Sequence, residues 1–214
     1  MTMLDEAGLR EAMARWARSL FERGFTVGSS GNISVRCGDG FLVTPTNSCM
    51  GFLDTGRTTK LDADWNPVSG DAPTKEVPLH RAFYEGRAHA QAVVHLHSTF
   101  ATALSCLADI DPEDAVAPIT PYVVMRVGRV PVLPYTMPGS PDVEALVRAR
   151  AADHAAILLA NHGPVVVGPS LESAVFAAEE LEETAKLLVL TRGLAVRHLD
   201  PAEIAALDAR FKLK

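Results

Sequence analysis

The chain has 214 residues, of which 48% are apolar and 21% are charged, and its formal net charge is −6 at pH 7. This length and composition suit one domain over residues 1–214, and an acidic balance without any Lys/Arg-rich stretch argues against nucleic acid as a partner. No run approaches the ~18 apolar residues of a membrane span, so no membrane partner is expected. Three cysteines without a CxxC pair and an N-terminus without an apolar leader predict a cytoplasmic protein.

Apolar spacing and turn residues define the predicted elements of the first half. Apolar residues recur every three or four positions up to Gly24, which predicts an amphipathic helix, and the turn at 38–40 predicts a hairpin. Pro78 suits only the first turn of the helix that would carry Glu76. The predicted elements are a helix over 5–23, a hairpin over 33–43, a loop over 44–51, two short strands around 66–67, and a helix that starts after 71–74.

The second half alternates apolar runs with helical patterns. Ser98 and Thr99 can cap a helix after the run AVVHLH, and the acidic run EELEE at 179–183 is interpreted as a solvated helix face. Mixed strands and helices predict an α/β fold, a sheet with helices on both sides. The predicted elements are a buried strand over 92–97, a helix over 98–106, strands over 122–127 and 129–135, a helix over 141–152, strands on both sides of 161–163, and a helix over 171–191.

The strongest chemical pattern is the pair His95 and His97 in the apolar run AVVHLH. Side chains two apart in a strand point to the same face, so the two imidazoles would lie side by side. Burying two histidines without partners costs free energy, and a shared metal ion removes that cost because neutral imidazole is a common ligand. Two core histidines with separate hydrogen bonds are the alternative.

Two further residues can complete a metal site. His162 stands in LLANHGPVVV, where two apolar strands meet and a glycine permits close backbone approach; a turn histidine with local hydrogen bonds is the alternative. Glu76 is predicted at a helix start, where the helix dipole favours a carboxylate; a simple helix N-terminal glutamate is the alternative. His80 one turn later is either an alternative ligand or a helix-surface or packing residue. Three histidines and a carboxylate suit a catalytic metal. The remaining histidines are expected to be structural or exposed: His89, His154 and His198.

The turn GSSGNIS, residues 28–34, is the candidate anion-binding segment. Its small residues would let backbone amides converge on an anion, and its serine and asparagine side chains add donors. A flexible loop is the alternative. The chain contains no Walker A lysine–serine pair and no GxGxxG that opens a helix, so nucleotide binding is not expected.

Taken in order, five short motifs resemble the class II aldolase/adducin family. The resemblance covers nearly the whole chain up to about residue 191 and implies a three-layer α/β/α fold with a central, mostly antiparallel mixed sheet. It also implies a homotetramer with sites at subunit interfaces and one divalent ion per subunit, with Zn²⁺ preferred and Mn²⁺, Fe²⁺ or Co²⁺ as alternatives. The motifs are GNIS at 31–34, TPTN at 44–47, TKE at 74–76, HLH at 95–97 and NHG at 161–163.

The resemblance also implies roles for individual residues. Glu76 would act as acid/base as well as ligand, and Tyr122 would reach the site of a neighbouring subunit. Two positions depart from the family pattern, because Asn47 stands where the family often has glycine and Lys75 stands where the aldolases have serine. The implied metal ligands are Glu76, His95, His97 and His162. The implied substrate- and phosphate-binding residues are Ser30, Gly31, Asn32, Thr46, Asn47, Thr74 and Lys75.

Within the family, stretches such as KEVPLH, TPYVVMR and EELEETAKL are most similar to the 3-oxo-tetronate 4-phosphate decarboxylases. This resemblance implies a lyase acting on a phosphorylated sugar acid, in which carbon dioxide leaves and a metal-stabilised enediolate is protonated to dihydroxyacetone phosphate. The enzymatic alternatives are a fuculose-phosphate-type aldolase and a pentulose-phosphate 4-epimerase. The non-enzymatic alternative is an adducin-like interaction module, which lacks the metal constellation.

Overall fold

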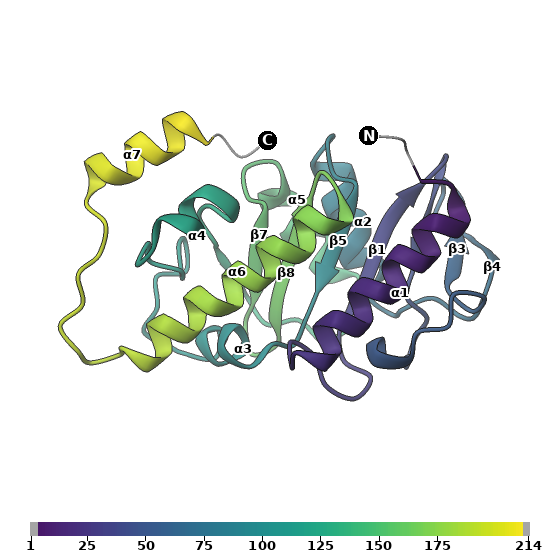
Figure 1. Ribbon diagram of the computed structural model, residues 1–214, viewed down its shortest axis with the longest axis horizontal. Coiled ribbons are helices and arrows are strands. Elements are labelled where there is room, and N and C mark those ends of the chain that lie inside the picture. Colours follow the sequence, from purple (N-terminus) through teal and green to yellow (C-terminus); the bar gives the residue numbers. More distant parts are fainter. Residues whose placement is uncertain (1–3, 212–214) are drawn as a thin grey trace.

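The computed structural model describes residues 4–211 (Figure 1). Residues 1–3 and 212–214 lie outside this range. Two predictions therefore stay predictions: the absence of an apolar leader at the N-terminus and the single domain over residues 1–214. The strands are β1 (Asn32–Cys37), β2 (Gly40–Val43), β3 (Thr59–Leu61), β4 (Pro67–Ser69), β5 (Ala92–His95), β6 (Val132–Leu133), β7 (Ala156–Leu159) and β8 (Gly163–Gly168). The helices are α1 (Glu6–Glu22), η1 (Met50–Phe52), α2 (Val77–Gly86), α3 (Thr99–Ser105), α4 (Pro121–Arg126), α5 (Asp142–Ala151), α6 (Leu171–Leu190) and α7 (Pro201–Arg210).

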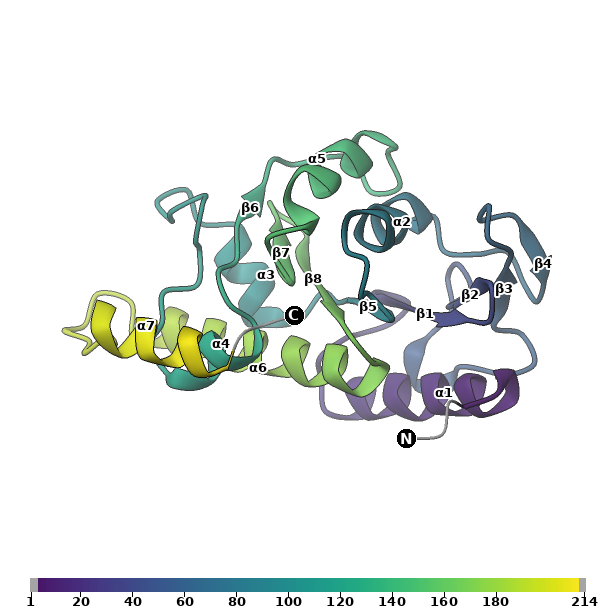
Figure 2. The ribbon, with the colours of Figure 1, turned by 90° about the horizontal axis from the view of Figure 1, so that it is seen from above.

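The strands of the described range form one sheet of order β4-β3-β2-β1-β5-β8-β7-β6. Every neighbouring pair is antiparallel except β6 and β7. Figure 2 shows α1 and α6 along one face of the sheet and α2 and α5 along the other. The predicted three-layer α/β/α fold with a mostly antiparallel mixed sheet is confirmed.

Both faces of the central strands are buried because helices cover each side. Side chains of β5 and β8 alternate between two cores. Val94 and Val166 pack with the α1 and α6 side, whereas Val93 and Val165 pack with the α2 and α5 side. This double burial accounts for the unbroken apolar runs in both strands.

Most predicted elements are present, with ends shifted by a few residues. The first predicted helix is α1, and the side chain of Asp5 caps it by accepting the N–H of Gly8 at 2.8 Å. The predicted hairpin is β1–β2, the short strands around 66–67 are β3 and β4, and the turn at 161–163 joins β7 to β8. Within residues 4–211, every helix is too short or too polar to cross a membrane.

The strand predicted over 122–127 is wrong, because most of these residues lie in helix α4. Its valines favour a strand by propensity, but Pro121 occupies the first helical turn, where its fixed φ suits a helix. Val123, Val124 and Val127 are buried at helical spacing, and α4 packs against α6 and α7. Tertiary packing therefore overrides local propensity.

Two other predictions for the C-terminal half need correction. The strand predicted over 129–135 is only the two residues of β6, because Pro131 and Pro134 on either side lack the N–H that a longer ladder requires. Helix α7 was not predicted, although Asp200 and Glu203 form a capping box at its start. Helix α7 buries none of its residues fully and lies apart from the sheet (Figure 1).

A buried carboxylate holds the start of α3. Ser98 occupies the N-cap position but makes no capping hydrogen bond, so the predicted side-chain cap is wrong. Both oxygens of Glu182 instead accept the backbone N–H groups of Phe100 and Ala101, each at 2.8 Å. Because Glu182 is buried, the acidic run at 179–183 is not wholly a solvated face. It ties α6 to the segment that directly follows the HLH motif.

We expect Glu182→Ala to lower the free energy of unfolding by about 1–3 kcal/mol, because two backbone N–H groups lose their acceptor. Urea denaturation measures the loss. The matched control is Glu183→Ala, which removes an exposed carboxylate of the same run and should change stability by less than about 0.5 kcal/mol. Equal stability of the two variants would contradict the capping role of Glu182.

Candidate metal centre

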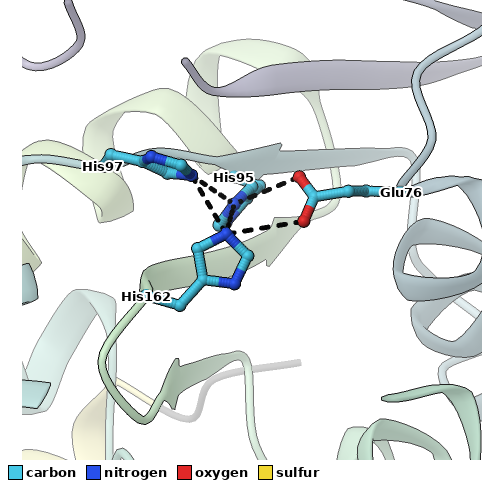
Figure 3. Close-up of side chains that lie close together, drawn as sticks. All are labelled: Glu76, His95, His97 and His162. Atoms are coloured by element: carbon cyan, nitrogen blue, oxygen red, sulfur yellow. Dashed lines mark hydrogen bonds and ion pairs between the residues drawn. The ribbon is translucent and has the colours of Figure 1, made fainter. Parts of the chain in front are cut away.

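Four side chains from three parts of the fold converge beyond the end of β5 (Figure 3). Strand β5 ends at His95, the turn between β7 and β8 carries His162, and Glu76 is the N-cap of α2. Because β5 is antiparallel to β1 and β8, its end lies beside their starts. His97 lies two residues beyond β5 and not in the predicted strand, yet its ring reaches the same cluster.

The ligand atoms of the cluster lie very close together. Nε2 of His95 is 3.1 Å from Nε2 of His97 and 3.3 Å from Nε2 of His162, and the last two nitrogens are 3.1 Å apart. Glu76 places Oε2 3.3 Å from His95 Nε2 and Oε1 3.5 Å from His162 Nε2. Hydrogen bonds alone cannot satisfy three nitrogens that meet pairwise, because each is either a donor or an acceptor and two must be alike.

The arrangement fits a tetrahedral divalent ion. Nδ1 of His95 lies 2.9 Å from the carbonyl oxygen of Pro164 and donates to it, so the lone pair of Nε2 points into the cluster. Metal–nitrogen bonds of about 2.0–2.1 Å place the corners of a tetrahedron about 3.3–3.4 Å apart. The three nitrogen–nitrogen separations of 3.1–3.3 Å agree with that geometry, and the Glu76 carboxylate brings the four ligand atoms within 4.8 Å of one another. The residues present can therefore hold one such ion.

Backbone conformation brings His162 to the cluster. Asn161 has a φ of 57°, in the left-handed region that asparagine tolerates better than most residues. Gly163 follows with a φ of 151°, and a Cβ at this position would lie 2.4 Å from the carbonyl oxygen of Leu96. The turn can approach the HLH segment only with glycine at this position.

Burial keeps His95 and His97 neutral, which is the form that binds metal. Burial lowers the pKa of His95 to about 4 despite the nearby carboxylate, and it also lowers the pKa of His97. Burial alone would raise the pKa of Glu76, but His95 and the hydrogen bond from Asn32 outweigh that effect and hold it below its usual value. His95 and His97 thus offer neutral nitrogen donors beside an ionised Glu76 carboxylate at neutral pH.

Three segments of the predicted phosphate pocket lie next to one another. Thr46 N–H donates to the carbonyl of Ala72, and Thr74 N–H donates to the carbonyl of Thr44, so the TPTN and TKE segments run side by side. The hydroxyl oxygen of Thr44 accepts the N–H of Ile33 at 3.2 Å, which joins both segments to GNIS. The motifs are therefore neighbours in space, and phosphate binding there stays a prediction.

The individual residues of this pocket differ in backbone conformation, in exposure and in whether their side chains already form hydrogen bonds. Asn47 has a φ of 57°, so it reproduces a backbone conformation that glycine favours, and the departure from the family pattern costs little. The hydroxyl of Ser30 donates to the carbonyl of Val27 at 2.6 Å and is used within its own turn. Lys75 is exposed, and Tyr122 on α4 has 55% of its surface exposed.

His80 lies outside the cluster of Glu76 and the three histidines. Its position agrees with a packing residue and not with a metal ligand. Its ring is fully buried and bonded to Asn32 and Ser34. Sequence reasoning also missed the loop over residues 136–139, which lines the cleft beside Glu76; its proline and glycine indicate a turn but not its place. The other histidines are as predicted: His89 and His198 are exposed, and His154 bonds to a backbone carbonyl.

Comparisons with known proteins agree with this geometry. The model of the class II aldolase and adducin N-terminal domain matches residues 11–189. The chain belongs to this family. A 3-oxo-tetronate 4-phosphate decarboxylase of Escherichia coli is 51% identical over 94% of this chain and 96% of that protein. An L-fuculose phosphate aldolase of Methanocaldococcus jannaschii is 35% identical over 81% of this chain and 91% of that protein. The crystal structure of YgbL from Klebsiella pneumoniae is 45% identical and superposes with a TM-score of 0.93, covering 96% of this chain and 100% of that one.

For this class II aldolase family member, we expect His95→Ala or His162→Ala to weaken binding of the divalent ion by more than about 100-fold. Loss of a residue that only supports a metal ligand weakens metal binding by at most about 100-fold, and loss of a ligand itself should cost more. Elemental analysis after dialysis measures the retained metal. The matched control is His89→Ala, which removes an exposed imidazole and should leave metal content unchanged. Full metal retention by either cluster variant would contradict the ligand assignment.

Proposed function

We propose that this protein is a metal-dependent carboxy-lyase that converts a 3-oxo-tetronate 4-phosphate into dihydroxyacetone phosphate and carbon dioxide. The observation that carries the proposal is the cluster of Glu76 with three histidines, in a chain about half identical to 3-oxo-tetronate 4-phosphate decarboxylases over nearly its full length. An adducin-like interaction module needs no such cluster, so the non-enzymatic alternative has no support from the site.

We propose that the resident ion is Zn²⁺, one per subunit, held by Glu76, His95, His97 and His162. Three imidazole nitrogens at tetrahedral separations and one carboxylate beside them suit Zn²⁺, while Mn²⁺, Fe²⁺ and Co²⁺ accept the same donors. When bound, such an ion acts as a Lewis acid that stabilises negative charge developing on substrate oxygens.

The proposed reaction breaks the bond between the carboxylate carbon C1 and C2 of the substrate. The bonding electron pair stays with C2 and delocalises onto the neighbouring ketone oxygen, while C1 leaves as carbon dioxide. Glu76 then delivers one proton, taken up from solvent, to C2. Because Oε2 of Glu76 accepts the N–H of Asn32 at 2.7 Å, the transferred proton is held on Oε1.

The substrate phosphate is proposed to bind where the GNIS, TPTN and TKE segments meet. Backbone conformations supported by Gly31 and Asn47, both with positive φ, allow N–H groups to converge on an anion. The exposed cation of Lys75 supplies a charge for the phosphate or the departing carboxylate. The full proposed set is Ser30, Gly31, Asn32, Thr46, Asn47, Thr74 and Lys75.

We propose a homotetramer in which Tyr122 of one subunit completes the site of its neighbour. The exposure of Tyr122 on α4 supports a role outside its own chain, since a large exposed aromatic side chain is typical of interfaces.

A cytoplasmic location is proposed as well, supported by three unpaired cysteines.

The second candidate function is an aldolase that cleaves a ketose phosphate. The 35% identity to an L-fuculose phosphate aldolase favours it, because an aldolase forms the same carbanionic intermediate by expelling an aldehyde. The products separate the two candidate functions, since only decarboxylation releases carbon dioxide.

The experiment that tests the proposal supplies metal-replete protein with 3-oxo-tetronate 4-phosphate and follows carbon dioxide and dihydroxyacetone phosphate together. We expect equal release of both products and loss of both after EDTA treatment. Absence of carbon dioxide together with aldehyde release from a ketose phosphate would replace the decarboxylase with the aldolase.

We expect Glu76→Gln to keep the fold and to lower kcat by about 10²–10⁴-fold, because the amide cannot donate an acidic proton to C2. Steady-state assays give kcat, and a thermal melt verifies folding. Glu11→Gln, which changes an exposed carboxylate on α1, is the control and should match the unmodified protein. Near-native turnover by Glu76→Gln would remove Glu76 as acid/base.

The proposed interface role of Tyr122 is tested by mixing subunits. Tyr122→Ala and Glu76→Gln should each be inactive alone, whereas co-expressed chains should regain activity in about a quarter of sites, those that pair an intact cluster with an intact neighbouring tyrosine. Activity no higher than that of the separate variants would mean that Tyr122 does not act across the interface.

A further inference from the structure

A polar stripe on α2 faces a polar stripe on β1. The stripe on α2 consists of Glu76, His80 and Tyr84, spaced four residues apart, and it packs against Asn32 and Ser34, spaced two apart on β1. Four helical residues rise about 6.0 Å and two strand residues about 6.6 Å, so the two repeats stay in register. The apolar side chains of β1 face the opposite core, beside α1.

These side chains form one continuous chain of hydrogen bonds that ends on the Glu76 carboxylate. Asn32 Nδ2 lies 2.7 Å from Glu76 Oε2, and Asn32 Oδ1 contacts His80 Nε2. On the other side of the imidazole ring, Nδ1 of His80 lies 2.7 Å from the hydroxyl of Ser34. That hydroxyl lies 3.1 Å from the hydroxyl of Tyr84.

Hydrogen-bond chemistry allows this chain to run in only one direction. An ionised carboxylate only accepts, so Asn32 must turn its NH₂ group toward Glu76 and its carbonyl oxygen toward His80. Nε2 of His80 must then carry the ring proton, which leaves Nδ1 as an acceptor. Ser34 donates to Nδ1, and Tyr84 donates to Ser34. The choice of tautomer at His80 thus follows from the charge on Glu76.

Burial makes this order costly to disturb. His80 and Ser34 are fully buried and Tyr84 is 4% exposed, so a broken link would leave a polar group without water or partner. Burial together with nearby His95 lowers the pKa of His80 to about 3, so its ring is neutral and offers the single proton that the chain requires.

We propose that His80 is a positioning residue for the reaction. Through Asn32, which donates an N–H to Oε2 at 2.7 Å, it holds the Glu76 carboxylate with Oε2 3.3 Å from His95 Nε2 and Oε1 3.5 Å from His162 Nε2. The proposal rests on the proposed acid/base role of Glu76. Burial alone requires partners for both ring nitrogens, but it does not require that one of them be the residue that binds the Glu76 carboxylate.

The test compares His80→Leu with His80→Gln. The amide N–H of glutamine can replace Nε2–H as donor to Asn32, whereas leucine fills similar space without a donor. We expect His80→Leu to lower kcat by about 10–100-fold, the usual range for groups that support a metal ligand, with KM changed by less than about threefold. His80→Gln should recover most of kcat. Should His80→Leu not fold, His80→Asn, whose shorter amide cannot reach Asn32, takes its place.

A second readout does not depend on turnover. Metal-free protein titrated with Co²⁺ reports both affinity and the visible absorption band, which depends on how Glu76 coordinates. We expect His80→Leu to weaken Co²⁺ binding by about 10–100-fold and to change the band, and His80→Gln to restore both. The matched control is Tyr84→Phe, which removes only the far hydroxyl and should stay within about threefold, since Ser34 still donates to His80.

The outcomes separate this inference from the proposed function. Co²⁺ affinity and band in His80→Leu equal to those of the unmodified protein would overturn the positioning role, as would equal impairment of the leucine and glutamine variants with equally lowered melting temperatures. If the unmodified protein releases no carbon dioxide, the decarboxylase proposal fails, while the Co²⁺ titrations still decide the role of His80.

Discussion

The constraint on which the site depends is the meeting of three imidazole nitrogens within 3.3 Å of one another beside a carboxylate. Neutral rings cannot satisfy one another pairwise, and protonated rings would repel at this distance in a buried site. A divalent cation turns the same arrangement into a favourable one. The cluster therefore implies metal binding by its geometry as well as by the likeness to family members.

The rest of the fold can be understood as support for this arrangement. Antiparallel pairing sets the end of β5 beside the starts of β1 and β8, and Gly163 permits the turn that carries His162 to touch the backbone after β5. Glu182 anchors α3 directly behind His97. The buried side chains of Asn32 and His80 form hydrogen bonds that end on the Glu76 carboxylate. The side chains of the cluster are thus held in place by contacts made outside the cluster.

Much of this site was predictable because the signals are local. Two histidines two residues apart in an apolar run, a histidine before a glycine between two strands, and a glutamate before a proline-started helix are patterns that short stretches of sequence carry. The five motifs in their order identified the family, and the mixture of strands and helices predicted a sheet with helices on both sides. Even so, the strand assigned to His97 was wrong, because β5 ends at His95.

What the sequence by itself determined is which residue types stand at each turn, strand end and helix start, since those preferences act over a few neighbours. Only the tertiary structure decided between contacts made across long separations. It made α4 a helix by packing valines on α6, buried Glu182 as a cap for α3, and set His80 against Asn32 and outside the cluster of Glu76 and the three histidines. These outcomes depend on which elements meet in space, and no short stretch of the chain contains that information.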